Sequence, residues 1–172
     1  MTEIPELKLV VITKPVGTVA PECVQALRSG NFFAARFGSR FLSLQLRSFD
    51  KDEREFVDID VHSKMLIVDD VFMSVGSANK NNRGMVYEAE MNVAILDASV
   101  GTWRKRILAN ILGGEASADV AGWFDQLKST ARTNDDAVRN AGVGAPPRGF
   151  AYGLSFGPEA ACKLQSFGPD AT

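Results

Sequence analysis

The sequence contains very little histidine: His62 is the only one among 172 residues. Cysteine is nearly as rare, and Cys23 and Cys162 lie far apart and form no CxxC pair. This inventory does not supply a zinc site, and neither a metal nor another cofactor is expected. Two cysteines also suggest no disulfide framework of the kind found in small secreted domains, so a reducing compartment is the default expectation.

The sequence also lacks an excess of positive charge, because its formal net charge is −2. Non-specific nucleic-acid binders usually carry many more Lys and Arg residues than acidic ones, since neutralising phosphates supplies their affinity. Nucleic acid is therefore a less expected partner, although a local basic patch is not excluded.

Long apolar runs are absent too. The opening residues, MTEIPELK, are acidic and lead into a short apolar run, which does not resemble a signal peptide. Nothing in the sequence approaches the 18 or so consecutive apolar residues of a membrane-spanning helix. The sequence therefore favours a cytoplasmic chain, and leaves open a peripheral contact with a membrane.

What remains is ordinary globular composition, with 45% apolar and 23% charged residues, in a length that suits one domain. Apolar, β-branched residues 7–13 predict a buried strand, and residues 21–30 predict a helix that begins at Pro21 and ends at Gly30. Alternating leucines predict a strand around residues 41–49.

Three further strands are predicted in close succession, over residues 56–62, 64–68 and 71–75, with Asp69-Asp70 as a turn. A strand over residues 90–96 and helices over 100–114 and 118–142 follow. This order predicts an α/β fold, a mixed β-sheet flanked by helices.

The predicted domain covers residues 1–135, and residues 136–172 are predicted to be an irregular tail rich in Gly, Pro and Ala. Four aromatic residues could pin this tail: Phe150, Tyr152, Phe156 and Phe167. Within it the hexamers SFGPEA and SFGPDA recur eleven residues apart, which is too short for a repeat architecture.

The lone histidine stands in a dense polar pattern. Side chains two apart on a strand share a face, so His62 and Lys64 should project together from one surface. Such a pair suits an anionic ligand at a cleft, because lysine supplies charge and histidine supplies a nucleophile or a proton. Asp69 has the opposite parity, and its expected task is to hold the turn.

Neutral donors follow the third of these strands. Gly76 lets the backbone come close to a ligand, and Ser77 and Asn79 offer a hydroxyl and an amide to phosphate oxygens. A carboxylate is then needed to hold the imidazole in one tautomer. Glu90 is the preferred choice and Glu88 its rival.

Together these residues form the pattern H-x-K-x4-D-x6-G-S-x-N, which resembles the HKD motif of the phospholipase D superfamily. The resemblance is strongest over residues 61–95 and weaker over 7–114. The continuation NNRGMVYEAEMNVAI is similar to that of bacterial phospholipase D-like enzymes, except for Gly84 where serine is common and Glu88 where aspartate is common.

The resemblance implies a metal-independent phosphodiesterase that forms a phosphohistidine. It implies that His62 is the catalytic histidine, that Lys64, Ser77 and Asn79 bind phosphate, and that Glu90 orients the imidazole. Asp69 completes the motif, and by the resemblance it is counted as a catalytic residue together with His62, Lys64 and Glu90. The preferred substrate class is a phospholipid headgroup, by hydrolysis or transfer, and the alternatives are a nuclease of the same superfamily and a non-catalytic partner module.

The mechanism implied by the resemblance needs two histidines, whereas this chain has one. A second HKD-containing half or a second copy of the chain should complete the site. Single-motif members usually begin with an additional strand–helix–strand before the strand that residues 7–13 resemble, which favours half of a two-motif enzyme over a homodimer.

One basic run, Arg104 to Arg106, falls on a predicted helix. We expect a solvated helix face there, with contact to anionic lipid headgroups as the alternative. Trp103 beside it is expected to be a core residue, although it could also lie at a membrane interface.

Overall fold

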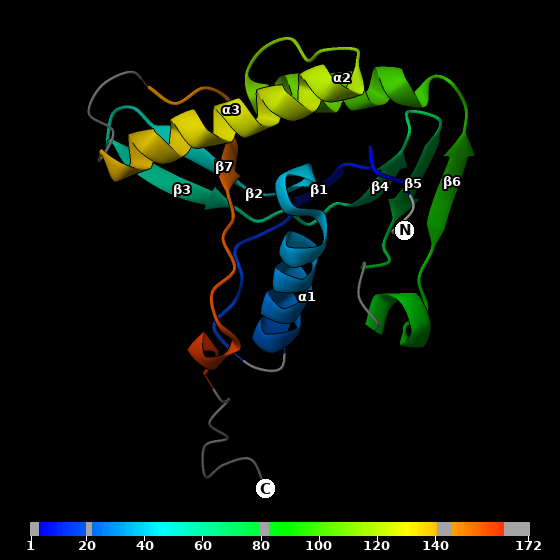
Figure 1. Ribbon diagram of the computed structural model, residues 1–172, viewed down its shortest axis with the longest axis horizontal. Helices are drawn as coiled ribbons and strands as arrows, with labels where there is room; N and C mark the ends of the chain where they lie inside the picture. Colours follow the sequence, from blue (N-terminus) through cyan, green and yellow to red (C-terminus); the bar gives the residue numbers. More distant parts are fainter. Residues whose placement is uncertain (1–3, 20–21, 80–82, 141–145, 164–172) are drawn as a thin grey trace, which may run out of the picture.

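The structure is a computed structural model that describes residues 4–19, 22–79, 83–140 and 146–163. The helices and strands of these residues are β1 (Leu9–Ile12), α1 (Glu22–Phe37), β2 (Phe41–Asp50), β3 (Glu55–Ile59), β4 (Lys64–Val68), β5 (Phe72–Gly76), β6 (Asn92–Leu96), α2 (Val100–Leu112), α3 (Val120–Arg139) and β7 (Ala151–Gly153). The predicted α/β class, with helices packed on sheet, is confirmed (Figure 1).

The strands form two sheets instead of one. In the first, β2 pairs in parallel with β1 and antiparallel with β3 and β7, so this sheet is mixed as predicted. In the second, β4, β5 and β6 pair in sequence as an antiparallel meander. The two sheets lie side by side beneath α2 and α3 (Figure 1).

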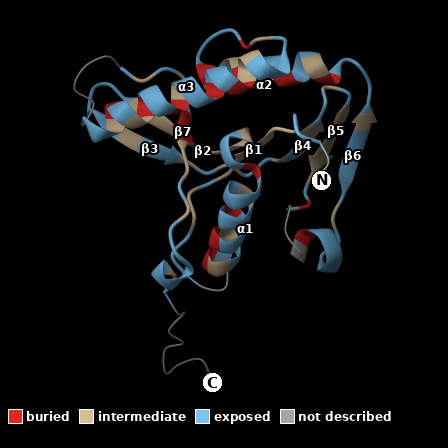
Figure 2. Cartoon of the chain, in the orientation of Figure 1, coloured by how far each residue is buried: buried red, intermediate tan, exposed pale blue. Residues whose placement is uncertain are grey.

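The main core lies between the first sheet and the α2–α3 layer, where the buried residues line the helix faces toward the sheet (Figure 2). It consists of small and branched apolar side chains, namely Leu44, Leu108, Leu112, Ala116, Leu127, Ala131 and Ala151. Asp119 caps α3 by accepting a hydrogen bond from the Gly122 amide, and this bond and one from the Ser117 hydroxyl lower the pKa of its carboxyl.

The segment predicted to be an irregular tail contributes to this core. Helix α3 continues past residue 135 to Arg139, and Ala151–Gly153 add strand β7 to β2. Asn134, fully buried, donates its amide to the carbonyls of Arg148 and Ala151 and accepts from the Arg148 amide. One helix side chain thereby satisfies the backbone that leads into β7. Phe167 lies outside the described residues.

The second sheet is tied to the helices by a partly buried ion pair. Arg104 on α2, only 5% exposed, donates two hydrogen bonds to the Asp70 carboxylate, of 2.7 and 2.5 Å, and two more to the carbonyls of Ser117 and Ala118. The expectation of a solvated basic face is therefore wrong for Arg104, although Lys105 and Arg106 are exposed. Trp103, predicted to be core, is 48% exposed.

Helix α1 differs from the sequence prediction at its end and in its cysteine. It runs through Gly30 to Phe37, because Gly30 is a buried packing position rather than a stop. Cys23 at its start forms a disulfide with Cys162, which overturns the expectation of no disulfide. The cysteines are 139 residues apart in sequence, and only the fold brings them together. The cysteine content therefore no longer supports the expectation of a reducing, cytoplasmic compartment.

Candidate functional site

The β4–β5 hairpin carries the site residues at its open end. Asp69 and Asp70 form its turn with positive φ values of 49° and 58°, which aspartate tolerates better than most residues. The Val71 amide donates to the Val68 carbonyl at 3.2 Å across this turn. The predicted turn is therefore present, and it fixes the register that pairs Lys64 with Gly76.

His62 and Lys64 lie side by side, although not as the strand pattern predicted. Strand β3 ends at Ile59, so residues 60–63 form a loop and only Lys64 belongs to a strand. The Lys64 ammonium nevertheless lies 2.9 Å from Nδ1 of His62 and 2.6 Å from its carbonyl oxygen. His62 is exposed and Lys64 half-buried, so the imidazole is open to a ligand.

The contact fits one tautomer of the neutral imidazole. An ammonium donates to Nδ1 of His62 only where that nitrogen carries no proton, and the ring proton then belongs to Nε2. Nucleophilic attack through Nε2 requires the opposite tautomer. A partner that accepts a proton at Nδ1, or a shift of Lys64 onto an anionic substrate, would supply it.

On the neighbouring strand, Ser77 forms the link between the ends of β5 and β6. Its amide donates to the Met91 carbonyl at 3.0 Å, and its hydroxyl accepts from the Met91 amide at 3.1 Å. Gly76 is required beside it, because a Cβ there would lie 2.1 Å from the Met91 carbonyl oxygen. The Ser77 side chain is exposed and thus remains accessible to a ligand oxygen.

Asn79 is exposed at the end of the same segment. The short π-helical turn Arg83–Tyr87 packs against its backbone, since a Cβ on Gly84 would lie 2.6 Å from the Asn79 amide nitrogen. The glycine that departs from the family pattern therefore fits a close backbone approach. The intervening residues 80–82, part of the NNRG continuation, lie outside the described residues.

Glu90 lies at the same end of the second sheet, two residues before β6 begins, and is half-buried. Lys64, Gly76 and Asn92 are in register across the three strands, which places the start of β6 on the order of 10 Å from Lys64. Among the described residues no hydrogen bond joins Glu90 to His62. Glu88, the rival carboxylate, is exposed in the preceding loop.

Asp69 lies at the opposite end of β4, roughly 15 Å along the strand from Lys64. The structure therefore brings His62 and Lys64 into contact and places Ser77, Asn79 and Glu90 at the same sheet end, while Asp69 stays at the turn. Below, the term His62 site means His62, Lys64, Ser77, Asn79 and Glu90.

Two supporting residues were missed from sequence. Asn92 accepts a hydrogen bond from the Ala78 amide at 3.3 Å and so braces the Ser77 segment. Asp70, next to the motif aspartate, carries the ion pair with Arg104. The local sequence around Asp70 does not predict this pairing, because Arg104 lies far away along the chain.

Comparison with known families identifies a domain type for this part of the chain. Residues 37–112 match the family model described as "Cardiolipin synthase, PLD-like domain". The matched segment begins at the end of α1, ends with α2 and contains the whole His62 site. No curated protein matches the chain.

No helix in the described part of the chain has both the length and the apolar character needed to cross a membrane. The match over residues 37–112 and the mixed α/β architecture confirm the resemblance stated from the motif. Residues 37–112 form a phospholipase D-like domain, which supports an assignment to the phospholipase D superfamily.

Proposed function

We propose that the protein is a phosphodiesterase of phospholipase D type, which cleaves or transfers phospholipid headgroups as one half of a site with two histidines. The observation that carries this proposal is the contact between the His62 imidazole and the Lys64 ammonium, exposed inside a phospholipase D-like domain. A cation and an imidazole at hydrogen-bond distance from one another suit an anionic ligand such as a phosphate diester, because lysine supplies charge and histidine supplies a nucleophile or a proton.

The chemistry needs two imidazoles. One attacks phosphorus, so that a nitrogen–phosphorus bond forms while the bond from phosphorus to the headgroup oxygen breaks. The other gives its proton to that departing oxygen. Water or another alcohol then attacks phosphorus and gives its proton to the second imidazole, while the nitrogen–phosphorus bond breaks and the first ring is restored. Lys64, Ser77 and Asn79 would stabilise the charge that grows on the phosphoryl oxygens in both steps.

Apolar side chains near the site support a lipid substrate over a nucleic acid. Met85, Val86, Tyr87 and Met91 flank the site residues, and Tyr87 and Met91 are 81% and 79% exposed. Met91 bonds through its backbone to Ser77, so Met91 lies directly beside a residue of the site. With a net charge of −2, the protein has no overall positive potential that would attract a polyanion such as a nucleic acid.

The second sheet supports the proposed pairing. Met65 and Leu66 are consecutive on β4, so their side chains point to opposite faces of the sheet, and both are exposed. A sheet that is apolar on both faces is typical of one covered on both sides. A second histidine-bearing half, or a second copy, could provide that cover together with the missing imidazole.

We expect the assembled protein to release headgroups from glycerophospholipid vesicles, and His62→Ala to lower the rate by at least 100-fold, since losing an acid–base group alone costs about 10²–10⁴-fold. Ser63→Ala, on the exposed neighbour of His62, is the matched control and should retain the wild-type rate. A headgroup panel measured by mass spectrometry identifies the substrate.

Activity of His62→Ala within about tenfold of wild type would remove His62 from the mechanism. Cleavage of single-stranded DNA without lipid turnover would favour the nuclease. An assembled protein that binds lipid phosphate but turns over no phosphodiester would be the non-catalytic module.

A further inference from the structure

A hollow of about 470 Å³ lies between the start of β2, the last turn of α3 and the residues that follow β7. Its volume is in the range of small-molecule sites. Leu42, Val138 and Leu154 are the aliphatic residues of its wall. The described lining residues include none of the His62 site, so a ligand held here would be separate from the phosphodiesterase chemistry.

One carboxylate, that of Asp135 on α3, lines this hollow and is half-buried. The Gly153 amide donates to both of its oxygens, at 3.1 and 3.2 Å, and is its only hydrogen-bond donor among the described residues. Glycine is needed there, because a Cβ on Gly153 would lie 2.7 Å from Oδ2 of Asp135. The backbone of β7 thus fixes the orientation of a carboxylate that still has lone pairs to share.

The negative charge of Asp135 has no cation in direct contact. Burial raises the pKa of its carboxyl, which means that the charged form is disfavoured in the free protein. The nearby Arg139 and Arg47 lower this pKa and Asp136 raises it. Arg139 pairs with Asp136, and Arg47 pairs with Asp58 at 2.6 Å. Because each arginine has an acidic partner of its own, one negative charge is left beside the hollow.

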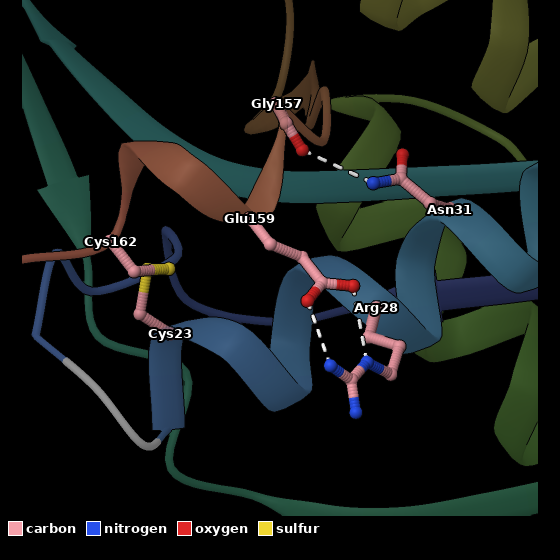
Figure 3. Close-up of a disulfide and its surroundings, with 6 residues drawn as sticks. All are labelled: Cys23, Arg28, Asn31, Gly157, Glu159 and Cys162. Atoms are coloured by element: carbon pink, nitrogen blue, oxygen red, sulfur yellow. Dashed lines mark hydrogen bonds and ion pairs between the residues drawn. A yellow bond between two sulfur atoms is a disulfide. The ribbon is translucent and has the colours of Figure 1, made fainter.

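The wall formed by the residues after β7 is held in place without a ligand. The Ser43 hydroxyl donates to the Leu154 carbonyl at 2.5 Å, and the Leu154 amide donates to the Ser43 carbonyl at 3.0 Å. Further along the same segment, the Cys23–Cys162 disulfide bonds the chain to α1 (Figure 3). A site that is already formed loses less conformational entropy when it binds its ligand.

We propose that this hollow binds a small organic ammonium ion, whose charge pairs with Asp135 and whose apolar part lies against the aliphatic residues of the wall. An ammonium group can donate to the carboxylate lone pairs that the Gly153 amide leaves open. The last turn of α3 lines the same hollow, and the partial negative charge of a helix C-terminus also favours a cation. Such a ligand gives a reason for a carboxylate where burial disfavours its charge.

Titration of the labelled protein with butylammonium chloride, followed by nuclear magnetic resonance, tests the site. We expect the signal of the Gly153 amide, which donates to Asp135, to shift and saturate. Butan-1-ol keeps the apolar part without the charge and should bind at least about tenfold more weakly. Ethanolammonium chloride keeps the charge without the longer apolar part and should bind about tenfold more weakly.

The affinity should also depend on pH through Asp135. A cation favours the charged carboxylate, so butylammonium binding should weaken as the pH is lowered through the pKa of Asp135. Butylammonium itself keeps its charge over this range, because its pKa is close to that of lysine, about 10.4. Asp125→Asn, on an exposed position of the same helix, should leave this pH dependence unchanged.

Asp135→Asn should weaken butylammonium binding at least about tenfold and remove its pH dependence. Val138→Trp keeps the carboxylate but fills the hollow, and should also abolish binding. Circular dichroism reports the folding of each variant, and the two variants are independent tests. Unchanged binding in either folded variant, the absence of a saturable Gly153 shift, or equal affinities for butylammonium and ethanolammonium would overturn the proposal.

Discussion

The two sheets of the molecule share apolar strands but differ in what covers them. In the first, Leu44 is fully buried between β1, β7 and the α2–α3 layer. In the second, Leu66 is 46% exposed on a strand of similar composition. Figure 2 shows the same contrast: buried residues gather under α2 and α3, while β6 is largely exposed.

The two sheets therefore differ in how far the chain itself covers them. The first sheet is closed by elements of the chain itself, including β7 from the far end of the sequence. The second sheet carries the His62 site, and Asp70 at its turn is tied to α2 by a partly buried ion pair with Arg104. The sheet that carries the proposed site is thus the more exposed of the two, as expected if that site is shared with a second histidine-bearing unit.

The largest expected effect on stability comes from truncating equivalent leucines in the two sheets. Leu44→Ala should lower the free energy of unfolding by about 2–5 kcal/mol, because it opens a cavity in a packed core. Leu66→Ala should cost about 1 kcal/mol or less, since half of that side chain already meets water. Urea unfolding of both variants measures the contrast, and equal losses would mean that the second sheet is covered in solution.

A smaller effect is expected at the tie between the second sheet and α2. Asp70→Asn leaves the Arg104 guanidinium without its charged partner and should cost about 1.5–3 kcal/mol. Asn tolerates positive φ, so the turn is kept. Asp69→Asn is the matched control on an exposed neighbour and should be nearly neutral; thermal unfolding distinguishes them. A larger loss of stability in Asp69→Asn than in Asp70→Asn would mean that Asp69, and not Asp70, holds the second sheet to α2.

The smallest expected effect concerns Asp135 on α3, where burial raises the pKa of the carboxyl above its ordinary value. Because its folded-state pKa is raised, the Asp135 carboxyl contributes to the stability of the folded protein in full only below the pKa that it has in the unfolded chain. This contribution is lost as the pH rises through the folded-state pKa. Asp135→Asn should therefore raise the melting temperature slightly at pH 7 and not at pH 3. Asp125→Asn, exposed on the same helix, should show no such difference between the two pH values.

Local patterns predicted most of the strands and the turn at Asp69-Asp70, because alternation and turn chemistry act over a few residues. The motif spacing also predicted the meeting of His62 and Lys64. It did so through the wrong geometry: His62 lies in a loop, and the long Lys64 side chain reaches back to it.

The features that sequence could not give depend on distant partners. Gly30 resembled a helix end because its true partner, the Phe156 ring, lies 126 positions further along the chain. The Cys23–Cys162 disulfide and the Arg104–Asp70 pair have the same origin. Residues 151–153 are too few to show the alternating pattern of a strand. They form β7 because they pair with β2 and because the Asn134 amide donates a hydrogen bond to the Ala151 carbonyl.

The central claim is that one imidazole per chain makes half a site. The most direct measurement is headgroup release per mole of protein over a thousandfold range of concentration, with sedimentation at each dilution to report the assembly present. The account predicts that specific activity falls with dilution in step with the loss of the species that holds two histidines. A sedimenting monomer of this chain with full, dilution-independent turnover would contradict it.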